Sequence, residues 1–161
     1  MNVRASLGIV LLVPGLAWCA NSSEVRDPRV GYWIEEKVSS SYPQAQGLQI
    51  SFADLGGGVI RYKLGANHNP ENMLVVEARC DGKDYPLMDG NGKANGRTYS
   101  CRVTGPRSVE STTGHDPSSP GVSSTVVETV SEDGKDLTGI ATYRDANGAT
   151  IRSLRRHFTR R

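Results

Sequence analysis

"LQISFADLGGGVIRYKL" runs from Leu48 to Leu64 and contains two stretches in which every second residue is apolar. Alternation with a period of two places successive side chains on opposite faces of a β-strand. The glycines between the two stretches tolerate the positive φ angles that tight turns need. The segment therefore predicts an antiparallel hairpin. Its apolar face consists of Leu48, Ile50, Phe52, Ile60, Tyr62 and Leu64.

The same alternation recurs along the rest of the chain, separated by Asp-Gly and Asn-Gly turns, and predicts an all-β domain. The helical candidate is Ile34–Gln46, and Pro43 limits it to one or two turns. We expect an antiparallel barrel or half-barrel of about 8–9 strands with one short helix. The other predicted strands begin near Gly31 and at LVVEARC (74–80), DYPL (84–87), YSCRV (99–103), SVEST (108–112), SSTVVETV (123–130), LTGIATYR (137–144) and ATIRSLRR (149–156).

The N-terminus predicts a signal peptide over residues 1–20. Arg4 precedes the apolar run Leu7–Trp18, which is shorter than the stretch of about 20 residues that spans a bilayer. We expect cleavage between residues 17 and 22, which leaves one β-barrel domain over residues 24–161. No later apolar run is long enough to be a transmembrane segment, so an exported, soluble protein is expected.

The charge balance argues against one class of partner. Lys and Arg number 19 and Asp and Glu 17, for a formal net charge of +2. Such a balance gives no general case for nucleic-acid binding, which needs a basic surface. We expect a monomer that does not bind nucleic acid.

Cys80 and Cys101 bracket a polar stretch that could be a metal loop, a redox pair or a structural link. Lys93 and Ser100 stand where a calcium loop needs an oxygen ligand and a bidentate Glu. The cysteines are too far apart in sequence for a C-x-x-C motif, and His68, His115 and His157 lie in separate elements. Both cysteines share the apolar phase of their strands. We therefore predict a structural disulfide in an oxidising compartment, with no metal and no cofactor.

Gly31-Tyr32-Trp33 resembles the G-x-W signature of lipocalins and their calycin relatives. The resemblance implies that Trp33 closes one end of the barrel under a basic side chain of the last strand, for which Arg152, Arg155 and Arg156 are candidates. In addition, "VGYWIEEKVSS", "CDGKDYPL", "SVEST", "ETVSEDGKDLT" and "YRDANG" are similar to segments of a family of uncharacterised, exported, lipocalin-like proteins of proteobacteria. That resemblance implies a periplasmic or secreted bacterial protein, but it implies no activity and no site.

Two binding hypotheses follow. In the first, the barrel lumen holds a small apolar or amphipathic molecule, with the loop from Gly114 to Gly121 as a lid. The alternative that the same rings simply fill the core stays open. The ring-bearing candidates for the lumen are Trp33, Tyr62, Tyr85, Tyr99 and Tyr143.

The second hypothesis is attraction of the C-terminus to an anionic envelope surface. A last strand with solvated arginines explains the same pattern. An enzyme is the third and least favoured reading, because no G-x-S-x-G motif is present and we assign no catalytic residue. The candidate residues of the C-terminus are Arg152, Arg155, Arg156, Arg160 and Arg161.

Overall fold

The computed structural model describes residues 26–36, 47–66, 73–114 and 121–161, which form one antiparallel sheet. The predicted signal peptide and the predicted lid lie largely or wholly outside these ranges. No helix in the described part of the chain could cross a membrane. The strands are β1 (Gly31–Glu35), β2 (Leu48–Asp54), β3 (Val59–Ala66), β4 (Leu74–Arg79), β5 (Tyr85–Asp89), β6 (Ala94–Gly105), β7 (Ser108–Gly114), β8 (Ser123–Val130), β9 (Asp136–Arg144) and β10 (Thr150–Arg160).

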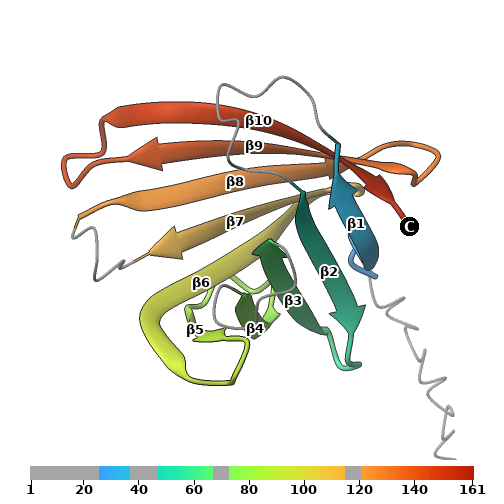
Figure 1. Ribbon diagram of the computed structural model, residues 1–161, viewed down its shortest axis with the longest axis horizontal. Coiled ribbons are helices and arrows are strands. Elements are labelled where there is room, and N and C mark those ends of the chain that lie inside the picture. The colour runs from blue at the N-terminus through green and yellow to red at the C-terminus, as the bar shows by residue number, and fades with distance from the viewer. Residues whose placement is uncertain (1–25, 37–46, 67–72, 115–120) are drawn as a thin grey trace, which may run out of the picture.

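The ten strands form a closed barrel, because β1 pairs with both β2 and β10 (Figure 1). The prediction of an antiparallel barrel is confirmed, whereas the half-barrel alternative and the count of about 8–9 strands are wrong. The short helix is also absent where it can be checked, since Ile34 and Glu35 belong to β1. Residues 37–46 of the proposed helix lie outside the described residues. Barrel closure depends on pairing between the two ends of the chain, which no local pattern reports.

The hairpin predicted from Leu48 to Leu64 is present as β2 and β3. Phe52 lies opposite Tyr62, and the turn closes with a hydrogen bond of 2.9 Å from the N–H of Leu55 to the carbonyl of Val59. The turn glycines at 56–58 have φ values of 84°, 59° and 73°. These positive angles are easily adopted only by glycine, which explains the Gly-Gly-Gly sequence.

Trp33 lies at the closed end of the barrel and is fully buried in the main core cluster. The guanidinium carbon of Arg160 lies 4.5 Å from the centroid of its ring. A basic side chain of the last strand therefore covers the Trp, but Arg152, Arg155 and Arg156 were the wrong candidates. The reason is register: Trp33 pairs directly with Arg160, which places both side chains on one face.

The disulfide between Cys80 and Cys101 is present, as predicted. It joins β4 to β6 at a place where the short β5 does not lie between them in the ladder. β4 pairs with β5 only at Leu74–Val75, and beyond β4 the chain reaches β6 directly. The N–H of Gly82 donates to the carbonyl of Cys101 over 2.9 Å. The disulfide thus closes a seam of the barrel that β5 leaves incomplete.

Candidate ligand-binding site

The barrel encloses a cavity of about 210 Å³, here called the lumen cavity. It is smaller than the range of about 300–1,000 Å³ typical of sites for drug-sized molecules. The cavity lies between the closed end and the strand ends at which Leu48 and Leu74 begin β2 and β4. Its lining is Leu48, Ile50, Tyr62, Leu64, Leu74, Leu87, Arg97, Tyr99, Ser111, Thr113, Ser124, Val126, Glu128, Gly139, Ala141, Tyr143, Arg156 and Phe158.

Three of the five predicted ring-bearing residues, Tyr62, Tyr99 and Tyr143, line this cavity. Tyr62 stacks between Phe52 and Tyr99, with ring centroids 5.1 Å and 5.4 Å apart. Stacked rings on β2, β3 and β6 form a rigid aromatic wall. That these residues bind a ligand stays a prediction, but their position on the wall of the cavity agrees with it.

Trp33 and Tyr85 do not line the lumen cavity. Trp33 belongs to the floor, where its Nε1–H donates to the carbonyl of Arg29 over 2.8 Å. Tyr85 directs its hydroxyl to the carboxylate of Asp81, with both oxygens at 3.2 Å. The alternating pattern placed both rings on the inner face correctly, but it could not give their height along the barrel.

A buried ion cluster forms the floor of the lumen cavity below the aromatic wall. Arg29 Nη2 lies 2.8 Å from Asp27 Oδ2, and Arg29 Nη1 lies 2.6 Å from Glu128 Oε2. The guanidinium carbon also lies 4.3 Å from the ring centroid of Phe52. Arg29 is 1% exposed. One cation is therefore shared between two buried carboxylates, an arrangement that needs all three partners because isolated buried charges are costly.

Burial also controls the titration of the polar groups that face the cavity. It raises the pKa of Glu128, and the opposing attraction of Arg29 does not cancel this effect. It likewise raises the pKa of Tyr62 and of Tyr99. Both phenols therefore remain neutral at physiological pH and can act as hydrogen-bond donors and acceptors.

A second guanidinium group enters the cavity from β10. Arg156 Nη1 lies 3.3 Å and 3.4 Å from the two carboxylate oxygens of Glu35. Gly139 lies opposite both Arg156 and Glu128 in the strand pairing. Because Gly139 has no side chain, the space between these two charged residues stays open. A Cβ there would meet Val126 and Phe158 at ordinary contact distances of 3.7 Å and 4.0 Å.

The arginines of the C-terminus do not form one uniform surface. Arg152 stacks on Tyr143 at 4.2 Å from the ring centroid, Arg156 points into the lumen, and Arg160 covers Trp33. Arg155 and Arg161 are exposed. Docking of these residues to an anionic surface stays a prediction, although much of the group has contacts within the molecule.

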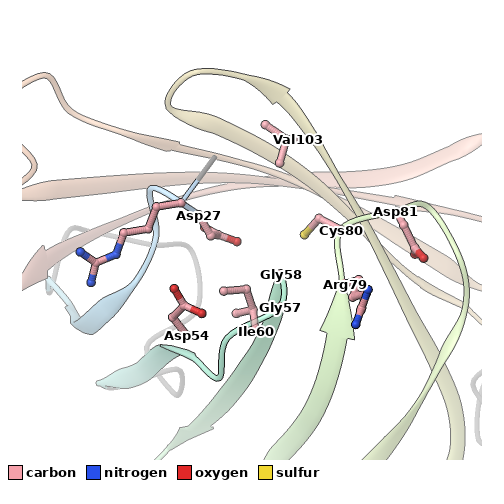
Figure 2. A pocket seen from close by; sticks show the side chains of 10 residues that line it. Asp27, Asp54, Gly57, Gly58, Ile60, Arg79, Cys80, Asp81 and Val103 are labelled. Carbon is pink, nitrogen blue, oxygen red and sulfur yellow. The ribbon is translucent and has the colours of Figure 1, made fainter. Parts of the chain in front are cut away.

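A second hollow of about 480 Å³ lies at the closed end (Figure 2). Arg29 separates the two spaces, since Asp27 and Cys80 line the closed-end hollow while Tyr99 and Glu128 line the lumen. Arg29 Nη2 lies 3.5 Å from Sγ of Cys80. The closed-end hollow is lined by Arg26, Asp27, Asp54, Gly57, Gly58, Ile60, Arg79, Cys80, Asp81 and Val103.

Sequence reasoning missed the charged residues of the lumen, namely Arg29, Arg97 and Glu128. Two of them carried a signal. Glu128 occupies the same strand phase as Val126 and Val130, and Arg97 that of Tyr99 and Cys101. A charge in an apolar phase marks an inward-facing polar group. Arg29 precedes the first strand, where no periodicity exists to reveal it.

These features define a closed antiparallel barrel of the calycin type with an internal cavity. A similar solved structure is that of a mutant of the fluorescent protein UnaG, a barrel of the fatty-acid-binding-protein type. The TM-score is 0.56 at 13% sequence identity, covering 83% of this chain and 96% of that chain. At this identity the likeness concerns the fold alone. No protein-family model matches the chain, and no curated protein is significantly similar to it.

Proposed function

We propose that this protein is an exported, non-catalytic binding protein that holds a small apolar or amphipathic molecule in its lumen. The lumen cavity carries this proposal. A concave apolar space with a few convergent polar groups is the usual form of a small-molecule site. Here leucines and stacked rings provide the apolar surface, while Arg97, Glu128 and Arg156 provide polar groups on separate strands.

The fold and the disulfide support two parts of the proposal. A closed barrel of about this size has an interior that side chains fill or that holds one small ligand. The similarity to UnaG agrees with a binding role in general. The bond between Cys80 and Cys101 agrees with an oxidising compartment outside the cytosol.

The polar groups of the lumen favour orientation of a ligand over its conversion. The carboxylate of Glu128 is held by Arg29 at 2.6 Å rather than presented as a base. His157, the histidine of the described residues, lies on the outer face between Glu36 and Asp136. Within the described residues no nucleophile is paired with a histidine, so binding is the simpler function.

Native mass spectrometry of protein purified from its own host tests the proposal. We expect a co-purifying small molecule on the wild type. Tyr62→Ala should lose it, because that ring forms the centre of the aromatic wall. Tyr32→Ala is the matched control, since Tyr32 lies next to Trp33 with its ring on the outer face, 36% exposed. Repeated purification without any bound molecule would contradict the proposal.

A further inference from the structure

The charged side chains of the lumen cavity restrict the chemistry of its ligand, an inference that rests on the function proposed above. Two guanidinium groups, Arg97 and Arg156, and one carboxylate, Glu128, line the cavity. A guanidinium does not lose its proton in proteins, so both positive charges persist at any pH of interest. Charges facing an apolar space are costly unless an opposite charge approaches them.

The carboxylate of Glu128 already has a strong partner. Its distance of 2.6 Å to Arg29 is at or below the range of about 2.7–2.9 Å typical of charge-assisted N–H···O pairs. The contacts between Arg156 and Glu35, at 3.3 Å and 3.4 Å, are longer, and both come from Nη1. Since a guanidinium has five N–H donors in a planar fork, Arg156 has donors beyond these contacts that a second carboxylate can accept from.

Arg97 and Arg156 approach the cavity from different walls. Arg97 belongs to β6 and Arg156 to β10, and three strands separate them on one side of the barrel. Gly139 keeps the space beside Arg156 open. Tyr62 and Tyr99, both neutral, provide ring surface in the same cavity. The lumen thus offers cationic groups from two walls and apolar surface around them.

We infer that the ligand class is a compact organic anion. Its carboxylate accepts hydrogen bonds from Arg97 and Arg156, and its apolar body packs against the aromatic wall and the leucines of β2 to β5. The anionic group replaces part of the hydration that the two guanidinium groups lose on burial. The cavity of about 210 Å³ limits the body to a small ring system or a short chain.

The test compares naphthalene-2-carboxylate with naphthalene-2-carboxamide, which have nearly the same shape but differ in charge. Isothermal titration at neutral pH with the disulfide-bonded protein should show at least about tenfold tighter binding of the carboxylate, since charged hydrogen bonds contribute about 1.5–3 kcal/mol. Arg97→Gln and Arg156→Gln should each reduce this ratio several-fold. Arg155→Gln should leave it unchanged, because Arg155 is adjacent on β10 but exposed.

Arg156→Lys provides a second variant that keeps the charge beside Glu35, and it should retain part of the preference. Equal affinity for carboxylate and carboxamide in the wild type would overturn the anionic class and leave the proposed lumen function intact. A preference that survives in both Gln variants would overturn the assignment to Arg97 and Arg156. Absence of binding by either probe would count against the inference and the proposed function together.

Discussion

Arg29 donates a hydrogen bond of 2.6 Å from Nη1 to Oε2 of Glu128, and both residues are buried. This contact ties the segment before β1 to the middle of the sheet at β8. Asp27 receives the other side of the guanidinium, and the carbonyl of Arg29 holds the indole of Trp33. The closed end of the barrel is therefore sealed by a polar cluster as well as by the apolar core.

Replacing Arg29 should destabilise the protein strongly. Arg29→Met leaves two buried carboxylates, Asp27 and Glu128, without their shared cation. Breaking a buried pair in this way costs about 3–5 kcal/mol in the free energy of unfolding. Urea unfolding followed by circular dichroism measures it. Arg61→Met is the control, because the pair of Arg61 with Glu77 is exposed and should contribute at most about 1 kcal/mol. Equal losses in the two variants would refute the role of Arg29.

The pH dependence of stability should reveal Glu128. Because burial raises its pKa above the ordinary value of 4.5, the folded protein takes up this proton at a higher pH than the unfolded chain does. Wild type should therefore gain stability relative to Glu128→Gln as the pH falls through the raised pKa, and lose it as the pH rises. Urea midpoints of both proteins, measured from mildly acidic to mildly alkaline pH, should diverge in this direction. Parallel curves would show that Glu128 does not titrate as inferred.

Removing the disulfide should weaken the seam between β4 and β6. Cys80→Ala with Cys101→Ala removes a link across a sequence separation of 21 residues. The chain-entropy estimate for a loop of this length is about 3 kcal/mol of unfolding free energy. Chemical denaturation of the double variant beside the oxidised wild type measures the loss. Peptide mapping under non-reducing conditions is the direct check, and two free thiols in exported protein would contradict the bond.

Filling the space at Gly139 should block the lumen without changing a polar group. A Cβ at this position meets only ordinary contacts, so Gly139→Ala should fold normally and Gly139→Val should project further into the cavity. We expect binding of naphthalene-2-carboxylate to weaken from wild type to Ala to Val, with little change in melting temperature. Ile140→Ala is the matched control, since Ile140 is the next residue of β9 and 44% exposed. Undiminished binding in Gly139→Val would place the ligand elsewhere.

The predicted lumen shows where sequence patterns are reliable. Tyr62, Tyr99 and Tyr143 line the cavity as expected, because strand alternation reports which face a side chain occupies. The same alternation could not separate them from Trp33 and Tyr85, whose rings lie inside the barrel at other heights. Height depends on the stagger between strands, and that stagger is a property of the pairing rather than of one strand.

The amino-acid sequence by itself determined the local structure of this protein. Alternation defined the strands and their inner faces, glycine-rich turns defined hairpins such as β2–β3, and strand phase paired Cys80 with Cys101. Only the tertiary structure decided that ten strands close into a barrel, that Arg160 rather than an earlier arginine covers Trp33, and that Arg29 joins Asp27 to Glu128. These contacts join residues from opposite ends or opposite walls of the barrel. Their energies depend on registers that accumulate around the whole sheet, which no short segment of sequence contains.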